Sequence, residues 1–330
     1  MTSTASTAST KHTKVTKPPK PAKPTNPTEP REVLIALVGV TGAGKSTFAS
    51  VASGRNDVEI GYGVDPCTQD PQAIRFLLDG HKITLIDTPG FDDDRRSDLE
   101  ILEDIGNWLI KEGYGSRQLL DGLILLHPVT LNRVGGMERR RTKLLQAILG
   151  SDAYKRVLIA TTMWDDLVPQ AALQLRVRGR TRDGGVWGDM VGRGAVVLQH
   201  NNNQESAHNI IRHIIKMPEK SGRAKPLLLQ DEMVEKKGRV KDTTLGKEMK
   251  RQLLESLELL SLRLRELEED EPPEFWGEHA DPERKQKRMD WEQEKARLVS
   301  KIERQQEQIK KLDGLVFKVK SIWSKLFGGR

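Results

Sequence analysis

Hydrophobic runs and helical patterns alternate along residues 32–217. Residues 33–38 are apolar at every position, which is typical of a strand buried on both faces in a parallel sheet. Residues 77–86 predict a hairpin, because Asp79-Gly80 is a strong turn signal between two apolar runs. The alternation predicts an α/β domain with a mostly parallel sheet. The other expected strands are 123–126, 157–160 and 195–198, and the expected helices are 46–53, 99–110, 137–149 and 206–215.

A different pattern begins after residue 217. Leucines recur at spacings of four and three residues, which is the heptad seam of a coiled coil. Glu271-Pro272-Pro273 ends the seam, and a second, highly charged helix is expected from Arg284 onward. Residues 218–330 are therefore predicted to form a helical extension, which either folds against the α/β domain or makes an extended or self-pairing coiled coil. The seam consists of Leu253, Leu257, Leu260, Leu264 and Leu267.

Composition and charge separate the same segments. Hydrophobic residues make up 36% of the chain and charged residues 31%, so part of the chain is expected to be solvated helix or disorder. Residues 1–31 are rich in Thr, Lys and Pro and hold six basic residues against one acidic residue, which predicts a disordered basic tail. Residues 32–217 hold 22 basic and 23 acidic residues. A basic nucleic-acid cleft is therefore not expected, and nucleic acid is not an expected partner.

Cysteine content and hydropathy indicate an intracellular protein. The single cysteine, Cys67, excludes an internal disulfide framework, which fits a reducing compartment. The longest apolar run, residues 33–40, is far shorter than the roughly 20 residues that a bilayer span requires. The N-terminus also lacks the apolar segment of a secretory signal. A cytoplasmic location is therefore expected.

Residues 312–327 predict an amphipathic helix near the C-terminus. Leu312, Val316, Val319, Trp323 and Phe327 share one helical face, and lysines lie elsewhere on the helix. This pattern suits a peripheral helix on an anionic membrane surface. A helix docked on the α/β domain and the end of a coiled coil are the alternatives.

The candidate chemistry starts in a glycine-rich sequence after the first expected strand. Residues 39–46 fit the pattern G-x-x-x-x-G-K-[ST], and a run that can form a helix follows. The glycines let backbone N–H groups point at a phosphate, Lys45 reaches the β- and γ-phosphate oxygens, and the Ser46 hydroxyl is a ligand for Mg²⁺. The expected nucleotide-binding residues are Gly39, Val40, Thr41, Gly42, Ala43, Gly44, Lys45, Ser46 and Thr47.

A second phosphate-site motif, Asp87-Thr88-Pro89-Gly90, lies at the end of the predicted hairpin. Asp87 is expected to hold Mg²⁺ directly or through a water, and the Gly90 N–H is expected to contact the γ-phosphate and respond to its loss. ATPases of this class more often end the strand in Asp-Glu. The form D-x-x-G therefore predicts GTP and GDP, with Mg²⁺, as the ligands.

These motifs resemble those of the septin-like GTPases of the translation-factor-related class, a group with the septins, the AIG1 immune-associated GTPases and the Toc translocon receptors. The likeness is greatest to the "G domain-containing" proteins of fungi and extends over about residues 33–250. It implies a P-loop NTPase G domain with three α/β/α layers. Besides residues 39–46, the matching sequences are Asp87-Thr88-Pro89-Gly90-Phe91-Asp92-Asp93, Leu126-His127, Asn132-Arg133, Thr161-Thr162-Met163-Trp164 and Leu229-Gln230-x-Glu232-Met233-Val234.

The resemblance also implies the remaining nucleotide contacts. Thr68 corresponds to the switch I threonine, whose hydroxyl completes the Mg²⁺ coordination when GTP is bound. Thr162 and Asp165 fall in the guanine-recognition motif, where a carboxylate accepts hydrogen bonds from guanine N1–H and N2–H₂. Met163 replaces the usual lysine, which implies weaker discrimination between bases. The fifth nucleotide loop is expected at residues 200–203, without the usual Ser-Ala-Lys sequence.

Slow hydrolysis of GTP is the predicted reaction. Phe91 stands where Ras-like enzymes carry a water-orienting glutamine, and an aromatic ring cannot polarise water. The resemblance implies that a second G domain in a homodimer supplies the missing charge, with Arg133 as the candidate; a surface arginine paired with a carboxylate is the alternative. The expected catalytic residues are Lys45, Thr68, Gly90 and Arg133. The alternative function is a nucleotide-stabilised scaffold with negligible hydrolysis, which assembles through the G domain or the coiled coil.

Overall fold

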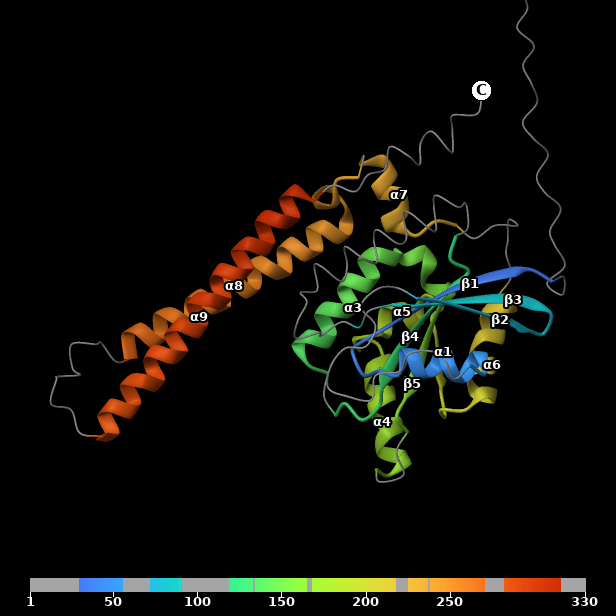
Figure 1. The fold of residues 1–330 in the computed structure, drawn as a ribbon, viewed down its shortest axis with the longest axis horizontal. Helices are drawn as coiled ribbons and strands as arrows, with labels where there is room; N and C mark the ends of the chain where they lie inside the picture. Colours follow the sequence, from blue (N-terminus) through green and yellow to red (C-terminus); the bar gives the residue numbers. More distant parts are fainter. Residues whose placement is uncertain are drawn as a thin grey trace, which may run out of the picture.

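The apolar runs of the sequence form the strands of a mixed sheet. The computed structural model describes residues 30–55, 72–88, 90, 119–132, 134–164, 168–217, 225–236, 238–270 and 282–315. Within this part of the chain, six strands pair in the order β2-β3-β1-β4-β5-β6, and all neighbours are parallel except β2 and β3 (Figure 1). The predicted mostly parallel α/β fold is confirmed. The strands are β1 (Glu32–Gly39), β2 (Gln72–Leu78), β3 (His81–Asp87), β4 (Gly122–Pro128), β5 (Val157–Thr162) and β6 (Val196–Gln199).

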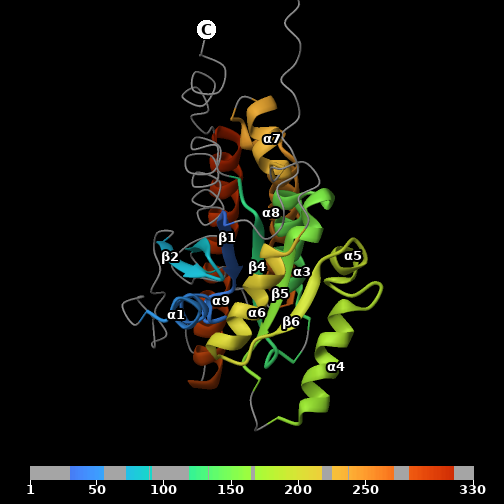
Figure 2. The ribbon, with the colours of Figure 1, turned by 90° about the vertical axis from the view of Figure 1, so that its right-hand side faces the viewer.

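The central strand β1 divides the hydrophobic core between the two faces of the sheet. Ile35 and Leu37 point to one face and pack with Phe48, whereas Leu34 and Ala36 point to the other. The first face is covered by α1 (Lys45–Ser53) and α6 (Gln204–Ile215), and the second by α3 (Gly136–Leu149) (Figure 2). The sequence predicted these three helices, and together with the sheet they confirm the expected three-layer arrangement. The expected helix 99–110 lies outside the described residues.

The predicted hairpin is also confirmed, but β2 begins five residues before its expected start. Gln72 and Arg75 interrupt the apolar run. Polar residues are tolerated there because β2 is an edge strand whose alternate side chains are exposed.

Three further helices were not predicted. They are short or carry few buried side chains; α4, for example, buries only Leu173 and Arg180 and therefore has no apolar stripe. They are α4 (Gln170–Thr181), α5 (Gly188–Gly192) and α7 (Leu228–Glu235).

The helical extension is an antiparallel hairpin of α8 (Thr244–Asp270) and α9 (Pro282–Gly314). The two helices lie side by side and project away from the sheet (Figure 1). Near the far end, the Trp291 indole Nε1 donates to the Leu267 carbonyl oxygen at 2.8 Å. At the base, the Gln252 side chain donates to the Arg140 carbonyl oxygen of α3 at 3.1 Å. The structure thus combines the two alternatives: one end of the hairpin docks on the α/β domain, and the rest is a two-helix coil within one chain.

The last turn of α9 packs at the base of the hairpin, in a hydrophobic cluster that continues into the α/β domain. Leu312 is 0% exposed and belongs to the same hydrophobic cluster as Leu245 and Met249, and Leu315 packs against it. The membrane interpretation of residues 312–327 is therefore wrong at Leu312, because protein and not lipid covers this side chain. Residues 316–327 lie outside the described part of the chain. Across the helices that the structure describes, none has the length and apolar character that crossing a bilayer demands.

We expect Leu312→Ala to lower the free energy of unfolding by about 2–5 kcal/mol, because truncating a fully buried leucine removes apolar burial and leaves a cavity. The matched control is Leu262→Ala on α8, where the side chain is 51% exposed and the change should cost less than about 0.5 kcal/mol. Urea unfolding of the full chain measures both. Equal, small losses would show that the end of α9 is not part of the core.

Candidate functional site

The loop between β1 and α1 brings backbone N–H groups and a lysine to the carboxyl edge of the sheet. Gly44 adopts a left-handed conformation, with φ of 92°, directly before the first residue of α1. A side chain would strain this backbone, so glycine is needed there. The Gly44 carbonyl oxygen accepts a hydrogen bond from the Phe48 amide at 2.8 Å, while the first amides of the helix have no intrahelical acceptor. Such a helix start favours an anion.

Lys45 lies buried inside this loop. Its ammonium group donates to the carbonyl oxygens of Gly39, at 3.3 Å, and Val40, at 3.1 Å. The residue is 7% exposed. Burial lowers the pKa of Lys45 to about 8, although the nearby Asp87 carboxylate acts to raise it. A cation whose hydrogen-bond acceptors are two neutral carbonyls would be stabilised further by a bound phosphate.

Ser46 and Asp87 place two oxygen ligands side by side. The Ser46 hydroxyl donates to Asp87 Oδ2 at 2.6 Å, and Asp87 is almost fully buried at the end of β3. Mg²⁺ is commonly held by one or two such hard oxygens together with phosphate oxygens and water, so the pair fits this ion. In the described part of the chain, no group of three or more His, Cys, Asp or Glu residues could hold a metal ion.

Gly90 lies against the glycine-rich loop. A Cβ atom at this position would lie 2.5 Å from the Thr41 hydroxyl oxygen and 2.6 Å from the Thr41 amide nitrogen, so only glycine fits. The Thr41 hydroxyl is buried and has no hydrogen-bond partner among the described residues. A buried hydroxyl in this state is costly. A phosphate oxygen bound in the loop would give this group a partner.

The end of β5 is tied to the same loop. The Thr162 hydroxyl donates to the Ala43 carbonyl oxygen at 3.0 Å. Thr162, which was predicted to belong to the guanine-recognition motif, thus supports the phosphate loop through this hydrogen bond. Met163 follows with a positive φ of 57° and an exposed side chain. The Trp164 indole turns back and donates to the Thr161 carbonyl oxygen at 3.0 Å.

The parallel strands thus gather most of the predicted residues at one edge. The residues that meet there are 39–46, Asp87, Gly90 and Thr162. Thr47 follows on the first turn of α1. The other predicted site residues, Thr68, Arg133 and Asp165, lie outside the described part of the chain, as does Phe91. Their roles stay predictions. At the expected fifth loop, His200 is buried, and burial lowers its pKa to about 4.

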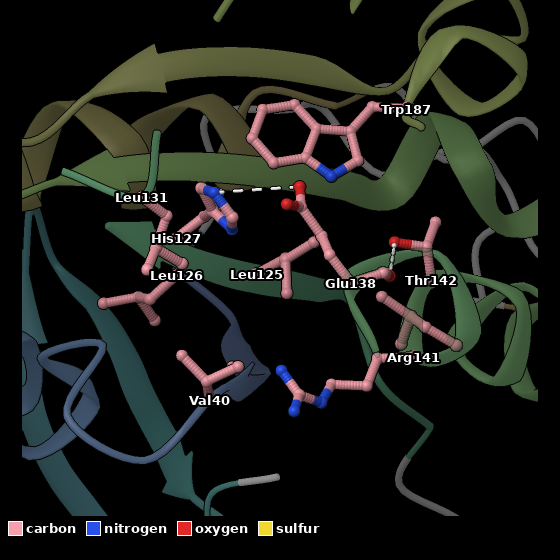
Figure 3. A pocket seen from close by; sticks show the side chains of 11 residues that line it. Val40, Leu125, Leu126, His127, Leu131, Glu138, Arg141, Thr142 and Trp187 are labelled. Carbon is pink, nitrogen blue, oxygen red and sulfur yellow. Dashed lines mark hydrogen bonds and ion pairs between the residues drawn. The ribbon is translucent and has the colours of Figure 1, made fainter. Parts of the chain in front are cut away.

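A polar cluster behind the loop was not predicted from the sequence. His127 at the end of β4 lies edge-on to the Trp187 ring, and burial and the Arg180 charge lower the pKa of His127 to about 3. Its Nε2 is 3.8 Å from Glu138 Oε1, so a neutral histidine touches the carboxylate without an ion pair. The cluster borders a cavity of about 50 Å³, with Val40 and Arg141 at the opposite end (Figure 3). No local sequence pattern links residues so far apart.

Comparison with known proteins gives a family and several relatives. The model of the AIG1 family matches residues 33–219. "GTP-binding protein A" of Dictyostelium discoideum is 26% identical over 131 residues, and the match covers 40% of this chain but only 28% of that protein. Among solved structures, a dimerisation-deficient mutant of Toc33 from Arabidopsis thaliana is similar with a TM-score of 0.46 and 15% identity, over 58% of this chain and 86% of that one. Toc33 in complex with Mg²⁺ and GMPPNP gives a TM-score of 0.44 and 16% identity, over 56% and 83%.

The buried lysine should make stability depend on pH in the absence of nucleotide. Because the pKa of Lys45 is about 8 in the folded chain and 10.5 for an ordinary exposed lysine, the unfolded chain binds more protons between these values. Stability therefore rises with pH in this window. We expect the free energy of unfolding of wild type, relative to Lys45→Met, to increase by on the order of 3 kcal/mol from pH 8 to 10.5. A difference that stays constant over this window in chemical unfolding would contradict the burial of the ammonium group.

Proposed function

The chain belongs to the AIG1 family, and from this premise we propose that it binds GTP and GDP with Mg²⁺ and hydrolyses GTP slowly. The observation that carries the proposal is the meeting of three groups at one edge of the sheet. These are the buried Lys45 ammonium, the Ser46–Asp87 oxygen pair, and Gly90 packed on Thr41. A cation, two metal ligands and a glycine in close contact with the loop suit a nucleoside triphosphate.

Each of these residues has a defined role in the proposed reaction. The backbone N–H groups of residues 39–44 bind phosphate oxygens, and Lys45 exchanges its carbonyl acceptors for phosphate oxygens and neutralises their charge. Ser46, Asp87 and Thr68 would hold Mg²⁺, which would supply positive charge beside the phosphates. Gly90 approaches the γ-phosphate through its backbone N–H. Thr68 and Gly90 position the attacking water.

Guanine is the proposed base. Asp165 supplies a carboxylate that matches the N1–H and N2–H₂ donors of guanine, whereas adenine lacks this pair of donors. The exposed Met163 side chain, next to the loop support Thr162, is able to cover one face of the ring. The relative from Dictyostelium discoideum is itself a GTP-binding protein by name. Competition between GTP and ATP for the purified chain tests this choice, and ATP as the stronger competitor would contradict it.

A homodimer through the G domain is the proposed route to faster hydrolysis. The resemblance of the motifs to those of septin-like GTPases implies such a dimer. Arg133 of one subunit would supply positive charge to the γ-phosphate bound by the other. The competing function is a nucleotide-stabilised scaffold with negligible hydrolysis, which Phe91 and Met163 favour. Residues 316–327 are the proposed contact with an anionic membrane surface, because Leu312 is fully buried in the protein.

We expect Lys45→Ala to weaken GTP binding at least about tenfold, or about 1.4 kcal/mol, because it removes the cation that meets the phosphates. Ser46→Ala should instead weaken mainly the part of the affinity that is lost on chelating Mg²⁺. The control is Lys82→Ala, an exposed lysine at the start of β3. Isothermal titration with and without EDTA measures all three. GTP affinity that is the same in Lys45→Ala and wild type would exclude this site.

If a partner subunit completes the site, turnover per molecule should rise with protein concentration. Arginine fingers contribute on the order of 10³–10⁵ in rate, so Arg133→Ala should flatten this rise and leave GTP affinity little changed. Mixing Arg133→Ala with Lys45→Ala should restore part of the rate, because an intact arginine then serves an intact pocket. Single-turnover hydrolysis from nanomolar to tens of micromolar protein is the measurement.

The control for this experiment is Arg193→Ala. Arg193 lies before β6, at the end of the sheet opposite the phosphate loop, and pairs with Asp189 at 2.8 Å. Turnover that is constant over the concentration range and indifferent to Arg133 would favour the scaffold.

A further inference from the structure

Two arginines of α4 hold the loop that joins β4 to α3. The Arg176 Nη1 donates to the carbonyl oxygens of Val129, at 3.0 Å, and Thr130, at 3.1 Å. The Arg180 Nη2 donates to the next carbonyl oxygen, that of Leu131, at 3.0 Å. Three consecutive carbonyl groups therefore turn toward α4. We refer to Arg176 and Arg180 as the α4 clamp.

Arg180 is itself fixed on the far side of the loop. It is 2% exposed. Its Nε and Nη2 donate to the two Glu138 carboxylate oxygens at 2.8 and 3.2 Å, and its guanidinium carbon lies 5.8 Å from the centre of the Trp187 ring. A forked pair of this kind sets both position and orientation. Because Glu138 lies in the first turn of α3, Arg180 connects α4, the loop and α3.

On its other side the same loop touches the candidate site. The Val129 amide donates to the Thr162 carbonyl oxygen at 2.9 Å, and the Thr130 hydroxyl lies 3.9 Å from the Met163 sulfur. Thr162 in turn supports the phosphate loop through Ala43. The clamp therefore acts on a loop that contacts the base-recognition segment directly.

Burial does not hold this loop in place. Residues 130–132 are exposed, including the Leu131 side chain. Their course therefore depends on hydrogen bonds, from α4 and from the Leu131 amide to the Pro128 carbonyl oxygen, more than on packing in the core. Removing the two bonds from Arg176 should leave the fold intact and change the direction in which the loop leaves β4.

We propose that Arg176 and Arg180 are positioning residues for GTP hydrolysis, because they orient the loop that continues into Asn132 and Arg133. This inference rests on the proposed function, since Arg133 is the residue through which hydrolysis is proposed to respond to a partner subunit. A misplacement of about 1 Å in a reacting group can cost on the order of 10²-fold in rate. The α4 clamp thus makes turnover depend on a helix that carries none of the proposed nucleotide-binding residues.

Arg176→Ala tests the proposal without removing the buried Arg180–Glu138 pair, whose loss would endanger folding. We expect turnover at saturating GTP and tens of micromolar protein to fall at least about tenfold, with GTP affinity within about twofold of wild type. Arg176→Lys should recover most of the turnover, because Arg176 serves both carbonyls with one nitrogen. Arg178→Ala is the control, since it removes the same charge from an exposed position on α4.

Hydrogen exchange of the backbone reports loop position independently of chemistry. Amides of residues 130–132 should exchange faster in Arg176→Ala than in Arg178→Ala. Equal exchange in the two variants, or faster exchange with unchanged turnover, would overturn the positioning role. Wild-type protein that hydrolyses no GTP at any concentration would instead contradict the proposed function, and the exchange comparison would show whether the clamp still holds the loop.

Discussion

The burial of a charged amine at the carboxyl edge of the sheet is the constraint on which the site depends. Lys45 is almost fully buried, so the chain must supply acceptors for its ammonium group. The carbonyls of Gly39 and Val40 do so because the loop curls around it. The conformation of this loop in turn needs contacts with neighbouring strands. Thr162 and Gly90 provide them from β5 and from the end of β3, so three strands cooperate to hold one amine.

Local patterns in the sequence were sufficient for the strands and for the phosphate loop. Both are contiguous: a buried strand is an unbroken apolar run, and the glycines, Lys45 and Ser46 are adjacent in the chain. The Arg180–Glu138 pair could not be found in this way, because its members are 42 residues apart. In addition, α4 has no apolar stripe from which the helix itself could be predicted. Hydrogen bonds between distant segments leave no periodic signal.

The C-terminal helices show a second limit of sequence patterns. A leucine seam indicates that one helical face is covered, but it does not indicate which surface covers it. Leu267 and Leu312 carry the same kind of signal. Leu267 lies in the seam beside α9, and Leu312 lies at the base of the hairpin, in a hydrophobic cluster that continues into the α/β domain. The difference arises from the hairpin turn, which returns the end of α9 to the base of α8 and places Lys250 2.8 Å from Asp313.

The start of α8 and the end of α9 lie together at the base of the hairpin, so the opposite end of the hairpin moves when the base tilts. A helix of the length of α8 extends about 40 Å at 1.5 Å per residue, and its base rests on α3 through Gln252 and Arg140. A tilt of about five degrees at that base would displace the far end by roughly 3 Å at this length. Small adjustments of α3, the helix that also carries Glu138, are therefore magnified at a distance from the phosphate edge.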